Sequence, residues 1–232
     1  MSVPIAVLAS GGGSNLQALM DNGEAGGAGR VALVISDRED AGALERARRH
    51  GIPAVHVAVR SRDAETIAAE TLDALHRHDI RFIALAGYLR LVPAPVIRAF
   101  DGRMLNIHPA LLPAFGGRGM YGLNVHRAVL AAGCRVSGAT VHRVTDAYDE
   151  GGIVAQWPVP VLAGDTPESL AARVLAVEHV LYPAVVNALL GDSRETRTAA
   201  TGDPIFRLAA TPPSQQLNEL AGDMLHLAGY QE

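Results

Sequence analysis

The chain has 232 residues, a length that suits one α/β domain with an ordinary core, or one domain followed by an extension. Its formal net charge of −4 is too mild for a general nucleic-acid or membrane-surface protein. The single cysteine, Cys134, excludes a cysteine-based metal cluster, and a composition without lysine excludes a Walker-type phosphate loop and Schiff-base chemistry.

A glycine-rich turn follows the first predicted strand, Val3–Ala9. The turn reads Ser10-Gly-Gly-Gly-Ser-Asn15, and the spacing of Ser14 and Gln17 fits a capping box, which predicts that a helix begins there. Backbone N–H groups exposed by glycines at a helix N-terminus make an anion site. A tight turn that binds nothing is the alternative, and the stretch is not the G-x-G-x-x-G dinucleotide fingerprint.

Strands and helices then alternate. We expect strands at Val31–Ile35, Pro53–Val59 and Arg81–Gly87, and helices at Ala41–His50 and Asp63–His78. This alternation predicts an α/β fold with a mostly parallel, twisted, Rossmann-like sheet and helices on both faces. Ligands of such sheets bind beyond the carboxyl ends of the strands.

A short buried strand is predicted at Met104–His108, because Met104, Leu105 and Ile107 are apolar and a proline then ends the run. Asn106 and His108 are two residues apart, so both side chains project from one face of this strand. An amide beside a proton carrier suits a carbonyl oxygen that becomes negative during attack. In isolation the pair would more often be a turn asparagine and a core histidine. Here Ser10–Asn15 and Gly87–Val92 also fall at strand ends, which favours one shared site.

The rest of the chain predicts a second set of elements. After a glycine-rich loop at Gly116–Gly122, we expect a helix at Asn124–Ala132, strands at Val136–Val144 and Ile153–Val161, and a long helix from Thr166 to about Leu190. Thr166 and Pro167 have the residue types of a helix cap and first position, and Pro183 is expected to kink the helix. The turn between the two strands carries Asp149, which on its own indicates only solvated turn chemistry.

The composition after the long helix shifts to Thr, Asp, Gly and Pro, and Ser214–Ala228 has the pattern of a terminal helix. We therefore expect a catalytic domain at 1–190 and a C-terminal extension at 191–232.

Five motifs together give the chain a family resemblance. They are Ser10-Gly-Gly-Gly-Ser-Asn15, Leu85-Ala-Gly-Tyr-Leu-Arg90, Asn106-Ile-His-Pro-Ala-Leu-Leu-Pro113, Val141-His142 with Asp149-Glu-Gly-Gly152, and Glu178-His-Val-Leu-Tyr-Pro183. In this order and spacing the chain closely resembles the phosphoribosylglycinamide formyltransferase family over about residues 3–190. The resemblance implies transfer of the formyl group of 10-formyltetrahydrofolate to the amine of 5'-phosphoribosylglycinamide, in de novo purine synthesis. It implies direct attack through a tetrahedral intermediate and no metal.

The resemblance also implies residue roles. Asn106, His108 and Asp149 match the catalytic trio. The residues that match the phosphoribosylglycinamide site are Gly13, Ser14, Asn15, Gly87, Pro109 and Glu178. Those that match the folate site are Arg62, Leu89, Arg90, Leu91 and Val92, together with Asn106 and Asp149. His142 is expected just behind the site.

Two departures and three alternatives stand beside this interpretation. The loop Phe115–Leu123 is longer than in the shortest family members, and Glu150 stands where a small residue is common. The alternatives are a formyl-folate hydrolase, a methionyl-tRNA formyltransferase and a non-catalytic phosphosugar-binding module.

We expect small-molecule substrates, no nucleic-acid or membrane partner, and a monomer or homodimer. No signal peptide or stretch of transmembrane length is recognised, which predicts a cytoplasmic location.

Overall fold

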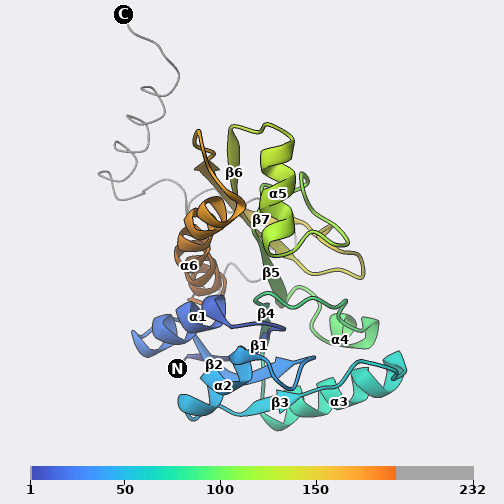
Figure 1. Cartoon of the computed structure of the whole chain (residues 1–232). Helices are drawn as coiled ribbons and strands as arrows, with labels where there is room; N and C mark the ends of the chain where they lie inside the picture. Colours follow the sequence, from blue (N-terminus) through green and yellow to red (C-terminus); the bar gives the residue numbers. More distant parts are fainter. Residues whose placement is uncertain (1, 192–232) are drawn as a thin grey trace, which may run out of the picture.

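A computed structural model of the protein describes residues 2–191. Within them seven strands form one sheet in the order β3-β2-β1-β4-β5-β6-β7 (Figure 1). The parallel strands are β1 (Val3–Leu8), β2 (Gly29–Ser36), β3 (Ala54–His56), β4 (Phe82–Leu85) and β5 (Met104–His108). The antiparallel strands are β6 (Val136–Arg143) and β7 (Ile153–Pro160). The predicted α/β fold with a mostly parallel sheet is confirmed.

Helices cover both faces of the sheet, as predicted. They are α1 (Ser14–Glu24), α2 (Gly42–Arg49), α3 (Ala64–Arg77), α4 (Ala94–Ala99), α5 (Leu123–Ala131) and α6 (Pro167–Gly191). Successive residues of β1 alternate between two cores: Ile5 and Val7 pack with α1, α2, α5 and α6, whereas Ala6 and Leu8 pack with α3 and α4. The central strands are therefore buried on both sides, which explains their nearly continuous apolar sequences.

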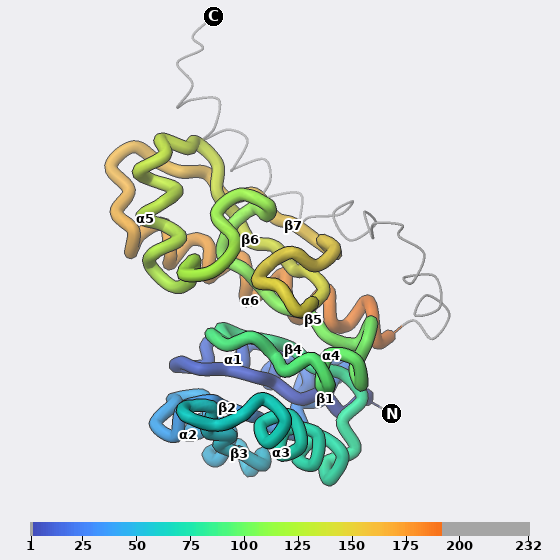
Figure 2. Tube along the Cα trace, turned by 90° about the vertical axis from the view of Figure 1, so that its right-hand side faces the viewer, coloured from blue at the N-terminus to red at the C-terminus, as the bar shows by residue number. Residues whose placement is uncertain are grey.

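The chain divides into two halves along the sheet. Figure 2 shows β1 to β3 with α2 and α3 gathered in one half, and β6, β7 and α5 in the other. Between the halves lie β4 and β5, whose carboxyl ends lead into Gly87 and Pro109. The halves therefore meet where the sequence predicts the site.

Three local predictions need correction. Ser14 is the first residue of α1 and not its cap: Gly13, with φ 76°, holds the cap position, and no side chain caps the helix. β3 covers three residues instead of the seven expected at Pro53–Val59. Helix α4 was not predicted; Pro93 holds its cap position and Pro95 lies in its first turn, where proline suits a helix.

Helix α6 begins as predicted, with the Thr166 hydroxyl accepting a hydrogen bond from the Ser169 N–H at 3.2 Å. Farther along, the hydroxyl of the fully buried Tyr182 lies 3.0 Å from the carbonyl oxygens of Leu85, the last residue of β4, and Leu105, the second residue of β5. By length and composition α6 is able to cross a membrane, contrary to the sequence expectation. Its packing against α1, α5 and β6 makes it a core helix of this fold. The predicted helix Ser214–Ala228 lies outside the described residues.

Candidate active site

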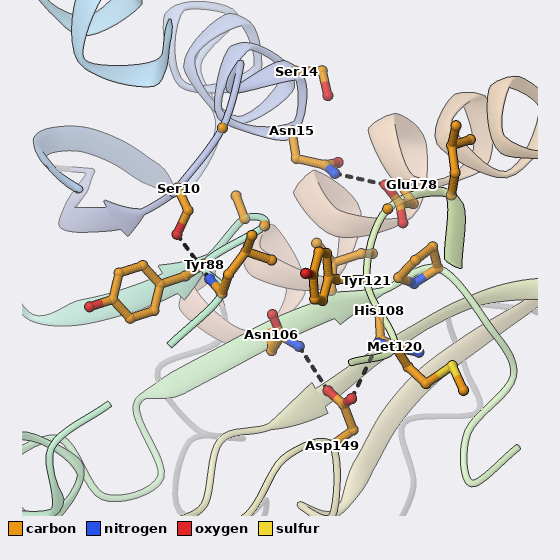
Figure 3. A pocket seen from close by; sticks show the side chains of 18 of the residues that line it. Ser10, Ser14, Asn15, Tyr88, Asn106, His108, Met120, Tyr121, Asp149 and Glu178 are labelled. Carbon is orange, nitrogen blue, oxygen red and sulfur yellow. Dashed lines mark hydrogen bonds and ion pairs between the residues drawn. The ribbon is translucent and has the colours of Figure 1, made fainter. Parts of the chain in front are cut away.

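A cavity of about 760 Å³ lies at the carboxyl ends of the parallel strands (Figure 3). It brings together most of the residues predicted from the sequence: Gly13, Ser14, Asn15, Gly87, Leu89, Arg90, Asn106, His108, Pro109, Asp149 and Glu178. A smaller cavity of about 50 Å³ is lined by Leu91, Val92 and His142 and shares Asn106 and Asp149 with the large one. Arg62 lines neither cavity: its Nη1 donates to the Ala58 carbonyl at 3.0 Å and lies 2.6 Å from Glu70 Oε2.

The turn before α1 offers backbone donors to the cavity. Gly13 adopts a left-handed conformation, and a Cβ added there would lie 3.0 Å from both Cα and Cβ of Ala43, so the turn needs glycine on two counts. The first N–H groups of α1 have no partner four residues earlier, and the helix dipole favours negative charge beside them. This turn is suited to an anion such as a phosphate group.

Glu178 reaches the cavity from α6 and meets Asn15. Asn15 Nδ2 donates to Glu178 Oε2 at 2.8 Å, and Glu178 is only 5% exposed. Burial raises the pKa of Glu178 to about 7, against the opposing effect of the Asn15 hydrogen bond. The Oδ1 atom of Asn15 is buried without a hydrogen-bond partner in residues 2–191. A carboxylate beside an unpaired carbonyl oxygen is a suitable acceptor pair for ligand hydroxyl groups.

His108 lies between two acceptors and is 3% exposed. Its Nε2 is 2.9 Å from the carbonyl oxygen of Phe115, and its Nδ1 is 3.5 Å from Asp149 Oδ2. Burial lowers the pKa of His108, although the Asp149 charge and the Phe115 hydrogen bond act in the opposite direction. A neutral ring satisfies only one of these acceptors, whereas an imidazolium donates to both. The arrangement therefore favours a histidine that takes up a proton during a reaction.

Asp149 is held in an ionised state. It occupies a left-handed conformation with φ 59°, and its Oδ2 accepts the Gly117 N–H at 2.8 Å. Burial alone would raise the pKa of Asp149, but the His142 contact, the His108 charge and the Gly117 hydrogen bond together lower it. The loop that carries Gly117 is thus tied to the carboxylate at the centre of the cavity.

His142 contacts the catalytic candidates directly, which is closer than its predicted place behind the site. The antiparallel register pairs Asn106 with His142. His142 Nδ1 lies 2.8 Å from the Arg143 carbonyl oxygen, and its Nε2 lies 3.0 Å from Asn106 Nδ2 and 3.5 Å from Asp149 Oδ1. In the neutral ring with the hydrogen on Nδ1, Nε2 accepts from Asn106, whereas in the imidazolium Nε2 donates to Asp149. Asn106 Nδ2 also lies 3.5 Å from Asp149 Oδ1. With Nδ2 engaged, Asn106 Oδ1 is left to accept from a ligand N–H.

Sequence reasoning missed several residues that line the cavity, including Asp37, Tyr88, Met120, Tyr121 and His126. Asp37 follows the last residue of a parallel strand, a position that could have identified it. The contact between the Phe115 carbonyl and His108 left no signal in the sequence, because it depends on how the loop folds back.

The profile of the formyl transferase family matches residues 3–186. The chain belongs to the formyl transferase family. Phosphoribosylglycinamide formyltransferase from Escherichia coli is 39% identical over 186 residues, which are 79% of this chain and 85% of that relative. These findings confirm the resemblance predicted from the sequence.

Two further family members show how far the similarity extends. The chloroplastic phosphoribosylglycinamide formyltransferase of Arabidopsis thaliana is 47% identical over 188 residues, or 80% of this chain. The matched part is 64% of that relative, so the chain spans less than two thirds of its length. The crystal structure of glycinamide ribonucleotide transformylase 1 from Symbiobacterium toebii has a TM-score of 0.76 and 46% identity, covering 82% of this chain and 88% of that one.

Formyl-folate is the co-substrate of this family. In residues 2–191 no group of three or more His, Cys, Asp or Glu side chains is placed to hold a metal ion.

Proposed function

We propose that the protein transfers the formyl group of 10-formyltetrahydrofolate to the amine of 5'-phosphoribosylglycinamide, a step of de novo purine synthesis. The observation that carries this proposal is the convergence of Asn106, His108 and Asp149 between an anion-binding turn and a second strand-end loop. Both substrates are small molecules, and the chemistry requires neither a nucleic acid nor a membrane. We further propose a cytoplasmic protein that is a monomer or homodimer.

The phosphosugar fits the side of the cavity next to α1. The backbone of Gly13, Ser14 and Asn15 would bind its phosphate. Glu178, together with the unpaired Asn15 Oδ1, would accept hydrogen bonds from the ribose hydroxyl groups. Gly87 and Pro109 would then enclose the glycinamide and place its amine next to Asn106.

The folate fits the opposite side, at the loop after β4. Leu89, Arg90, Leu91 and Val92 would present backbone groups to the pterin in and beside the smaller cavity. Arg62 would meet the glutamate tail where the tail leaves the cavity, after exchanging its contact with Glu70.

The reaction follows from these positions. The amine donates to Asn106 Oδ1 and attacks the formyl carbon, whose oxygen becomes an oxyanion. The amine proton passes to the pair formed by His108 and Asp149, directly or through an ordered water, and gives an imidazolium between Asp149 and the Phe115 carbonyl. This positive charge stabilises the oxyanion. Collapse of the intermediate breaks the bond to folate N10, which takes the proton back. Holding both substrates in attack geometry supplies much of the rate.

The first test is formyl transfer by the purified protein, followed through the folate absorbance. The expected result is tetrahydrofolate formation that depends on phosphoribosylglycinamide. Signal without the phosphosugar would instead indicate a formyl-folate hydrolase. Tight phosphosugar binding without any signal would indicate a non-catalytic binding module.

A further inference from the structure

Asp37 has no part in the reaction proposed above, yet it lies directly after β2 at the edge of the cavity. Its side chain is only 2% exposed although it carries a carboxylate. Two donors reach it: the Ser10 hydroxyl at 2.5 Å from Oδ1, and Arg90 Nε at 3.0 Å from Oδ2. A buried carboxylate loses its hydration, so it is retained only where hydrogen bonds of this kind replace the water.

These contacts continue into the loop after β4. The Ser10 hydroxyl oxygen accepts the Leu89 N–H at 2.9 Å while its own hydrogen points to Asp37. A hydroxyl that donates to a carboxylate becomes a better acceptor, so the two bonds strengthen each other. Leu89 and Arg90 are adjacent in sequence, and each is tied to the same carboxylate, one through Ser10 and one directly. The ends of β1, β2 and β4 are thereby joined through one charged group.

The Arg90 contact also fixes the direction of its guanidinium. Arg90 is more than half exposed and lines both cavities, whereas Asp37 engages only its Nε. An exposed arginine samples many rotamers unless a partner selects one, and the buried Asp37 carboxylate selects one here. The contact therefore replaces part of the lost hydration of Asp37 and also positions the Arg90 guanidinium.

We propose that Asp37 is a positioning residue for the folate side of the cavity: through Ser10 and Arg90 it holds Leu89–Val92 in the conformation that binds the pterin. The identity of this ligand rests on the proposed function. The positioning itself rests on the three contacts among Asp37, Ser10, Leu89 and Arg90.

The decisive variant is Asp37→Asn, which keeps the size of the side chain and removes the charge. Ser10 and Arg90 reach different oxygens of Asp37, and an asparagine has an oxygen at only one of these two positions, so one of the two donors faces an NH2 group instead. We expect the KM for 10-formyltetrahydrofolate to rise about tenfold, the typical effect of losing one charge-assisted hydrogen bond. The KM for phosphoribosylglycinamide and kcat should change less than about twofold, within the scatter of such effects.

Asp40→Asn is the matched control. Asp40 lies three residues later in the same segment and forms an exposed ion pair with Arg38, which we expect to contribute nothing to either KM. If Asp37→Asn does not fold, Ser10→Ala takes its place, because it breaks the link to Leu89 and leaves the Asp37–Arg90 pair intact. The same selective rise in the KM for the folate is expected of it.

A second measurement tests, without any substrate, whether Asp37 holds the loop after β4 in place. The Leu89 N–H is protected by Ser10, so its hydrogen exchange, followed by NMR, should be faster in Asp37→Asn than in the unsubstituted protein. The amide of Ala6, inside β1, serves as the internal reference and should not change.

The outcomes separate the two proposals. Unsubstituted protein that transfers no formyl group would overturn the proposed function, while the Leu89 exchange rate still decides whether Asp37 holds the loop. Active protein in which Asp37→Asn leaves the KM for the folate and the Leu89 exchange unchanged would overturn the positioning role alone. An equal rise in both KM values, with a lower unfolding temperature, would also overturn it, because Asp37 would then only stabilise the fold.

Discussion

The two sides of the cavity are built in different ways. The side next to α1 uses backbone groups of a short turn, and its geometry follows from glycines adjacent in sequence. The side that carries Asn106, His108 and Asp149 uses side chains brought together from residues 36 to 43 apart, by the pairing of β5 with β6 and by the turn after β6. The first side is suited to binding an anion, and the second to moving protons. The following changes test this division, from the largest expected effect to the smallest.

Asp149→Asn should be the most damaging change. It removes the charge that attracts a proton to His108, and we expect kcat to fall by roughly 10²- to 10⁴-fold, the usual range for a lost acid–base group. Binding of phosphoribosylglycinamide, measured by calorimetry, should stay nearly unchanged because the anion turn is untouched. Asp146→Asn, an exposed aspartate of the same turn, is the matched control and should behave like the unsubstituted protein. Equal loss of binding and turnover in Asp149→Asn would contradict the division.

Glu178→Gln tests the point where α1 and α6 meet, and it separates stability from function. The pKa of Glu178 is raised from 4.5 to about 7 by burial, so the folded state holds a proton that the unfolded state has already lost. The effect of Glu178 on the free energy of unfolding is thus absent below pH 4.5. Between pH 4.5 and 7 it lowers this free energy, and above pH 7 the reduction stays constant at about 3 kcal/mol.

The glutamine variant carries no such charge. Its free energy of unfolding, from denaturant titrations, should therefore exceed that of the unsubstituted protein at pH 8 and match it near pH 4. Its KM for phosphoribosylglycinamide should rise, because a ribose contact is weakened. A variant that is no more stable at pH 8 would show that Glu178 is not destabilising.

Gly116→Ala should disturb the catalytic side by displacing Asp149. An added Cβ would lie 2.6 Å from Leu112 Cδ2 and 3.2 Å from Asp149 Cβ, so the loop or Asp149 must shift. We expect kcat to fall about tenfold, since small misplacements of reacting groups are costly. Gly152→Ala, where a Cβ meets open space, is the control and should leave kcat unchanged. Normal turnover in Gly116→Ala would show that Asp149 tolerates displacement.

Ser14→Asp tests the anion turn alone. A carboxylate at this position faces the substrate phosphate, and we expect the KM for phosphoribosylglycinamide to rise about tenfold by charge repulsion. The KM for the folate should not change. Ser14→Ala removes only the hydroxyl and should have a much smaller effect, because the phosphate is bound mainly by backbone. Unchanged affinity in Ser14→Asp would move the phosphate to another part of the cavity.

Arg62→Ala should have the smallest effect. Arg62 lines neither cavity and already pairs with Glu70, so its contact with a folate glutamate replaces an existing interaction. We expect the KM for 10-formyltetrahydrofolate to rise about twofold to fivefold, the range for a partly exposed ion pair. Exposed Arg60→Ala is the control. A tenfold rise in Arg62→Ala would show that the tail depends on this arginine more than the structure suggests.

The same division explains what could be predicted from the sequence. The strand, turn and helix from Val3 to Glu24 follow from apolar runs and glycines, and even there the cap was assigned to Ser14 instead of Gly13. Helix α4 was missed because proline disrupts a helix when it lies in the interior but is well tolerated in the first turn. Local patterns thus located the elements but not every boundary.

The contacts of the catalytic side were harder to predict from the sequence. The family resemblance supplied Asp149 and placed His142 nearby, but neither spacing nor periodicity shows that the register pairs His142 with Asn106. The Phe115 carbonyl reaches His108 because Phe115 adopts a left-handed conformation with φ 57°, which is uncommon for such a residue. The connection of Asp37 to Leu89 joins residues from separate strands. Such contacts depend on how the sheet packs, so no local sequence pattern predicts them.

Helix α6 carries two contacts at fixed angular positions. Glu178 contacts Asn15, and Tyr182 contacts β4 and β5, and the two residues are four apart, on the same helix face. One residue inserted before Glu178 would turn both side chains by about 100° and detach them together. Insertions beyond either end of the helix leave this angle unchanged. Insertions and deletions among relatives of this protein are therefore expected at the ends of α6 and not within it.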